Sequence, residues 1–126
     1  MISITDYCLA RIGSPFVWGE TDCACFARGW AVEGLGAADI PSPRLGSARE
    51  WAEYCRQRPM LDRARDWAAE AGLVEASDAP REGDIGIVMP DGRQCFALRC
   101  GGQWVARSEQ GIAMLDTPHL ALFRAA

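Results

Sequence analysis

Cysteine and histidine are the residues of this sequence that could supply a nucleophile, a general base or soft metal ligands. The 126 residues include six Cys and one His. Cys23 has the most informative position, because Thr21 or Asp22 can cap a helix that begins there. The N–H groups and the dipole at a helix N-terminus favour a thiolate. We therefore expect Cys23 to be a candidate nucleophile, on a helix whose apolar stripe contains Cys23, Phe26, Ala27 and Trp30.

A metal site is the rival use of the cysteines, because Cys23, Cys25, Cys95 and Cys100 together offer four thiols. Cys23 and Cys25 are two positions apart on the expected helix, so their side chains point in different directions. Cys95 and Cys100 are five positions apart along an expected hairpin, which places them on opposite sheet faces. We therefore expect no metal and no cofactor, and we expect most of the cysteines to be reduced thiols in the core.

Length and charge restrict the class of protein. A chain of 126 residues forms one domain, here 1–126. The net charge of −4 disfavours binding to nucleic acid. All 13 basic residues are Arg, which excludes a Schiff-base Lys and a phosphate-loop Lys. No apolar run approaches the ~20 residues of a membrane span, and the first residues lack the pattern of a signal peptide.

The hydrophobic periodicity changes from helical to extended halfway along the chain. Helices are expected over residues 4–12, from Cys23 to Gly34 or Gly36, from the cap Ser47 to the break at Arg58-Pro59, and over residues 61–71 with Gly72 at the end. After a polar connector at residues 75–83, strands are expected over residues 85–89, 95–99, 104–107, 112–115 and 120–123. This order predicts an α+β fold, with N-terminal helices packed on a five-stranded antiparallel sheet.

Residues 15–26 carry a motif, Pro-Phe-Val-Trp-Gly-Glu-Thr-Asp-Cys-Ala-Cys-Phe, and Gly83-Asp84 precedes the first strand. This pattern resembles the NlpC family of papain-like cell-wall peptidases. The closest resemblance is to a phage and prophage branch that shares Pro-Phe-x-Trp-Gly-x-x-Asp-Cys and is found among tail-tip genes. The order of elements is also similar over nearly the whole chain, so the resemblance implies a papain-like fold of the NlpC type.

The resemblance assigns roles position by position. It places Cys23 at the nucleophile and Gln94 where the base His should stand. Ala106 or Arg107 falls where a polar residue should orient that base, and Phe16 replaces a Tyr that often lines the substrate site. A Gln amide cannot accept a proton near neutral pH, and a general base contributes about 10²–10⁴-fold to the rate. The catalytic set therefore departs from the pattern of active members at two of its three positions.

His119 is the other candidate base, because it begins the last expected strand and a strand end could approach Cys23. Trp18 and Trp104 are expected beside the cleft, where they would line a glycan or peptide groove or anchor an interface. Asp22 borders the same site and is interpreted chiefly as the helix cap. Asp84 is interpreted as a residue that fixes the turn into its strand.

Two functions follow from this resemblance. The favoured one is a structural tail-tip protein of a phage, prophage or gene-transfer particle, assembled in the host cytoplasm and located in the virion tail. Its partners would be other tail-tip or hub proteins. Contacts are expected from the loop at residues 36–46, from an edge strand at residues 119–123, and from Arg44 and Arg124. The alternative is an active thiol peptidase or amidase that cleaves stem peptides of peptidoglycan.

Overall fold

The computed structural model describes residues 2–41 and 43–126. Four helices precede six strands in this part of the chain. The helices are α1 (Ile4–Arg11), α2 (Cys23–Leu35), α3 (Ala48–Gln57) and α4 (Met60–Ala71). The strands are β1 (Leu73–Ala76), β2 (Ile85–Val88), β3 (Cys95–Cys100), β4 (Gln103–Ser108), β5 (Gly111–Leu115) and β6 (His119–Ala125). The predicted α+β class is confirmed, and none of these helices is long and apolar enough to cross a bilayer.

The strands form one antiparallel sheet in the order β1-β6-β2-β3-β4-β5. The predicted number of five strands is wrong, because the sheet has a sixth strand, β1. This strand lies between the end of α4 and the polar connector, where no strand was expected. Gly72 ends α4 in the left-handed region at φ 87°, and the chain then continues directly into β1. The expectation that residues 119–123 form a sheet edge is also wrong, because β6 lies between β1 and β2.

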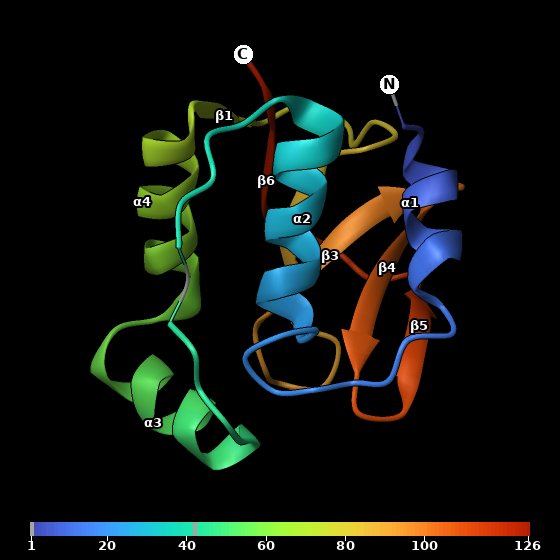
Figure 1. Ribbon diagram of the computed structural model, residues 1–126. Helices are drawn as coiled ribbons and strands as arrows, with labels where there is room; N and C mark the ends of the chain where they lie inside the picture. Colours follow the sequence, from blue (N-terminus) through green and yellow to red (C-terminus); the bar gives the residue numbers. More distant parts are fainter. Residues whose placement is uncertain (1, 42) are drawn as a thin grey trace.

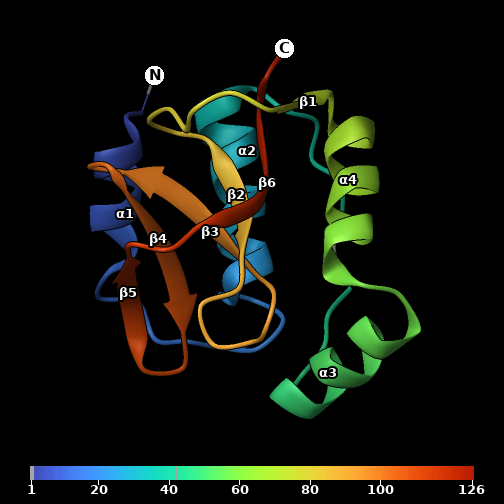
Figure 2. The ribbon, with the colours of Figure 1, turned by 180° about the vertical axis from the view of Figure 1, so that it is seen from behind.

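The main core lies between the helices and one face of the sheet. In Figure 1, α1 and α2 lie in front of the strands, and in Figure 2 the strands lie in front of these helices. The largest residues of this core come from α1, α2 and the inward positions of β2, β3 and β6: Tyr7, Phe26, Trp30, Ile85, Ile87, Leu98 and Phe123. This layer fixes α2, and therefore Cys23 at its start, against β3.

A smaller cluster lies on the other face of the sheet. Its buried members alternate along the strands with those of the main core and are Val88, Ala97, Trp104, Ala106 and Leu122. The indole of Trp104 reaches from β4 across β3 to β2, where a Cβ atom on Gly86 would lie 2.6 Å from the ring. Gly86 therefore gives the indole its space, and Trp104 is fully buried.

Helix α3 differs from the other helices because none of its residues is buried. Its start follows the expected cap: Glu50 donates its backbone N–H to the Ser47 hydroxyl at 3.1 Å, and the Glu50 carboxylate accepts from the backbone of Gly46. Trp51 and Tyr54, the large aromatic residues of this helix, are only half-buried. Figures 1 and 2 show why: α3 lies below α4 and to one side of the strands, so it does not cover the sheet.

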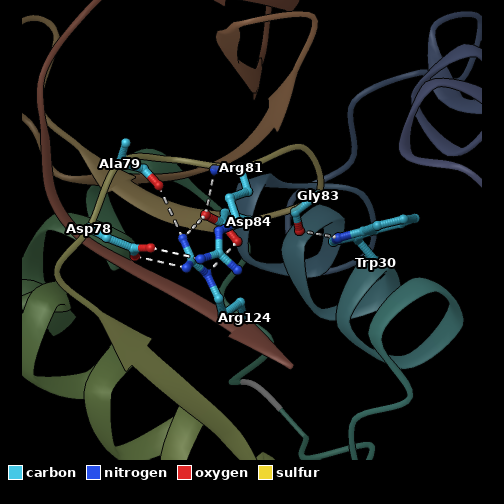
Figure 3. A network of polar contacts seen from close by, with 7 residues as sticks. All are labelled: Trp30, Asp78, Ala79, Arg81, Gly83, Asp84 and Arg124. Atoms are coloured by element: carbon cyan, nitrogen blue, oxygen red, sulfur yellow. Dashed lines mark hydrogen bonds and ion pairs between the residues drawn. The ribbon is translucent and has the colours of Figure 1, made fainter. Parts of the chain in front are cut away.

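The Gly83-Asp84 pair joins α2, β6 and the segment before β2 (Figure 3). Trp30 Nε1 donates to the carbonyl of Gly83 at 2.7 Å. The Asp84 carboxylate accepts two bonds from Arg124, at 2.7 and 3.1 Å, and one from the backbone N–H of Arg81 at 2.8 Å. Asp84 therefore fixes the turn into β2, as predicted. Arg124, expected at an interface, is instead paired inside the fold with Asp78 and Asp84.

Candidate active site

Asp22 and Cys23 begin α2 in the predicted arrangement. Asp22 is the N-cap residue: its Oδ1 accepts from the backbone N–H of Cys25 at 3.0 Å. Its Oδ2 accepts from the backbone N–H of Gly19 at 2.8 Å, so both carboxylate oxygens are bonded within the loop and the helix. Asp22 is only 1% exposed. Its role as a cap is confirmed, and it leaves Cys23 as the first residue of the helix.

Phe16 and Trp18 lie together in the loop that leads to Cys23. Their rings form an edge-to-face pair with centroids 4.8 Å apart, and both are half-buried. Thr21 fixes this loop, because its hydroxyl accepts from the backbone N–H of Val17 at 2.6 Å and donates to the carbonyl of Pro15 at 2.9 Å. The loop therefore presents an aromatic pair at the start of α2.

Cys23 is half-buried, and its surroundings favour the protonated thiol over the thiolate. Burial raises its pKa to about 12, and the charges of Cys95 and Asp22 would add to that shift. Hydrogen bonds from the backbone N–H groups of Phe96 and Ala24 oppose the shift without overcoming it. Near pH 7 the protonated thiol therefore predominates. The thiolate expected at the helix start is therefore not favoured, because burial outweighs the helix terminus.

Gln94 lies directly before β3, the strand whose first residues contact Cys23. Its side chain forms a hydrogen bond with α4. Gln94 Oε1 accepts from the backbone N–H of Leu61 at 2.9 Å, in the first turn of α4. Pro59, the N-cap residue of α4, makes no side-chain capping bond. From its position just before β3, Gln94 therefore supplies the acceptor that the N-terminus of α4 lacks.

The structure does not bring His119 to Cys23. The His119 ring packs on Trp104 with centroids 5.7 Å apart, and Trp104 belongs to the cluster on the sheet face opposite α2. Trp104 is fully buried, so it does not line a surface groove, and within residues 2–41 and 43–126 its Nε1 atom has no hydrogen-bond partner. Arg107, one of the two positions for an orienting residue, donates to the carbonyls of Arg11 and Ser14 and ties β4 to the end of α1.

Two hollows flank α2, and Cys23 is in the lining of neither. One, of about 410 Å³, has a polar lining that includes Glu20, Cys25, Arg28 and Arg44. The other, of about 230 Å³, lies between α3 and α4 and has a partly aromatic lining that includes Trp51, Tyr54, Trp67 and Phe96. The sequence analysis did not predict the second hollow. The missed signal was the apolar stripe of α3, which the fold leaves half-covered.

The cysteines lie in separate places. Cys23 is near Cys95, whereas Cys100 is near Cys8. Among the residues that the structure describes, no group of three or more His, Cys, Asp or Glu side chains is arranged to hold a metal ion. The four thiols considered as ligands therefore do not converge.

The comparisons with known proteins give one match. A family model described as a domain of unknown function, DUF6950, matches residues 3–125. No curated protein matches, and no solved structure matches. Because the match covers nearly the whole chain, the chain belongs to the DUF6950 family.

Proposed function

We propose that this chain is a structural tail-tip component of a phage, prophage or gene-transfer particle, with an NlpC-like domain that no longer catalyses peptide hydrolysis. The observation that carries the loss of catalysis is the position of Gln94. The side chain at the expected base position has its oxygen bonded to the N-terminus of α4, and an amide accepts no proton at neutral pH.

The state of the nucleophile supports the same proposal. A thiol with a pKa of about 12 needs a base to act near pH 7, and His119 lies on the opposite face of the sheet. The proposed location in the tail and the proposed tail-tip or hub partners rest on the resemblance of residues 15–26 to the phage branch of the NlpC family. In this proposal the chain is assembled in the host cytoplasm.

Two surfaces suit a role in assembly. Strand β5 is an edge of the sheet, and its Met114 side chain is 59% exposed. Arg44 borders the polar hollow on the outer side of α2. These surfaces replace β6 and Arg124, which lie inside the fold. A stable contact there would bury on the order of 1,200–2,000 Å² in total.

The test is the composition of purified particles. Particles from a strain that encodes the chain are purified, analysed by mass spectrometry and imaged at the tail tip. We expect the chain in intact particles at a fixed copy number, and we expect Cys23→Ala to leave assembly unchanged. A chain that is found only free in the lysate would contradict the structural role.

The alternative function is an active thiol peptidase or amidase that acts on peptidoglycan stem peptides. The observation in its favour is the retained nucleophile position: Cys23 begins α2, and the nearby backbone N–H groups of Phe96 and Ala24 act to lower the pKa of its thiol. The test compares hydrolysis of a stem peptide by the wild-type chain and by Cys23→Ala. Turnover that disappears in the variant would establish the enzyme and overturn the non-catalytic proposal.

A further inference from the structure

Cys8 and Cys100 form a pair of thiols that no catalytic role uses. Cys8 lies on the inner side of α1 and is 7% exposed, whereas Cys100 is the last residue of β3 and is half-buried. Thr5, which precedes Cys8 by about one helical turn, has its hydroxyl 3.6 Å from the sulfur of Cys100. Cys100 is also close enough to contribute to the raised pKa of Cys8, and both residues belong to or pack against the main core. The two cysteine side chains therefore lie close to each other where α1 packs against the end of β3.

We propose that Cys8 and Cys100 are a redox-active dithiol that closes to an intramolecular disulfide when glutathione disulfide becomes abundant. The two residues are about 90 positions apart in the sequence, and the packing of α1 on the sheet brings their side chains together. A disulfide here joins the first helix to the β3–β4 hairpin. That hairpin turns through Gly101 and Gly102, both at positive φ, next to Cys100.

The exposure of the two thiols sets the order of the chemistry. Cys100, the more exposed thiol, loses its proton and attacks one sulfur of glutathione disulfide, which forms a mixed disulfide and releases one glutathione thiolate. The sulfur of Cys8 then attacks the sulfur of Cys100, and its proton passes to the second glutathione as that leaves. Overall, two protein thiols are oxidised and one glutathione disulfide is reduced to two glutathione thiols.

The surroundings of Cys8 make this thiol slow to react by itself, so its oxidation depends on Cys100. Burial raises the pKa of Cys8 to about 12, with Cys100 and Glu82 adding to the shift and Arg11 opposing it. A protonated, buried sulfur is a poor first nucleophile, but it is well placed to resolve a mixed disulfide on its neighbour. The disulfide therefore requires both cysteines.

The experiment incubates the folded chain in glutathione buffers that range from fully reduced to fully oxidised. The reaction is stopped with acid, remaining thiols are alkylated, and the protein is analysed by intact mass and by peptide mapping without reduction. We expect a mass loss of about 2 Da in oxidised buffer and one cross-linked peptide pair, Cys8 with Cys100. The melting temperature should rise by about 10 °C and return to its starting value after reduction, because a long loop is closed.

Single substitutions separate this pair from the other thiols. Cys8→Ser and Cys100→Ser should each abolish the disulfide, whereas the matched control Cys55→Ser, a half-buried thiol on α3, should leave it unchanged. Mapping of the wild-type chain alone decides the question if a variant does not fold. A wild-type chain that keeps both thiols in oxidised buffer, or that links Cys8 or Cys100 to a different cysteine, would overturn the proposal.

Discussion

Replacement of Gln94 by Ala tests the assignment of its side chain to α4. The substitution removes the acceptor that bonds the backbone N–H of Leu61 at 2.9 Å. Pro59 supplies no side-chain cap, so that N–H loses its partner at the start of the helix. We expect Gln94→Ala to destabilise the fold while leaving the other helices intact.

The magnitude follows from the kind of bond lost. Loss of an N-terminal cap costs about 0.5–2 kcal/mol, and Leu61 is half-buried, so solvent replaces the lost acceptor only in part. We therefore expect the free energy of unfolding to fall by about 1.5 kcal/mol, which for a chain of this length lowers the melting temperature by roughly 5 °C. Gln94→Glu should recover most of the loss, because a carboxylate accepts the same bond and is favoured at a helix N-terminus.

Urea unfolding followed by circular dichroism measures the change, and hydrogen exchange of the Leu61 amide locates it. The matched control is Gln57→Ala, an exposed glutamine at the end of α3, which should change stability by less than about 0.5 kcal/mol. If Gln94→Ala has the stability of the wild type and leaves exchange at Leu61 unchanged, the capping role is refuted.

Four further predictions test other parts of the structure. At pH 8 iodoacetamide should modify Cys23 about 100-fold or more slowly in the folded chain than in urea, because burial raises its pKa to about 12; equal rates would contradict that pKa. Because the pKa of the Cys23 thiol is higher in the folded chain than in the unfolded chain, the free energy of unfolding should fall as the pH rises from the unfolded pKa toward 12. This thiol should contribute about 1.4 kcal/mol per pH unit to that fall, and Cys23→Ala should reduce the dependence of stability on pH in alkaline urea titrations. Gly86→Ala should cost about 1–3 kcal/mol in urea unfolding, because its Cβ would lie 2.6 Å from the Trp104 ring; a neutral result would mean that the indole moves freely. Asp84→Ala should cost about 3 kcal/mol, because it removes the buried carboxylate that accepts from Arg124 and from the backbone N–H of Arg81; Arg124→Ala should then cost less in this background than in the wild type.

Helix boundaries were the part of the fold that the sequence predicted best. Asp22 and Ser47 cap α2 and α3, while Gly36 and Gly72 adopt the left-handed region after α2 and α4, all as local residue chemistry indicates. Strand β1 was missed because four residues with one buried position carry almost no periodic signal. It forms because Leu73–Ala76 finds a pairing partner in β6, about 50 residues later.

The candidate site shows the same division between local and non-local information. The position of Cys23 at the start of α2 follows from the adjacent cap, so the sequence predicted it. The burial of its thiol depends on β3, and the bond of Gln94 depends on Leu61, a residue 33 positions away. The orientation of Trp104 depends on a glycine two strands away. None of these contacts leaves a local pattern.

Stability and catalysis compete at position 94, and this limits how the proposed loss of activity could be reversed. A His at this position would have to turn toward Cys23 to act as a base, and it would then leave the Leu61 N–H without the acceptor that Gln94 provides. Burial of the thiol that it faced would still oppose formation of the thiolate, so proton transfer to the imidazole would be disfavoured. We therefore expect Gln94→His to be less stable than the wild type and still inactive on stem peptides. A peptidase built on this chain would need two changes together, a new cap for α4 and an opening of the contact between Cys23 and the start of β3.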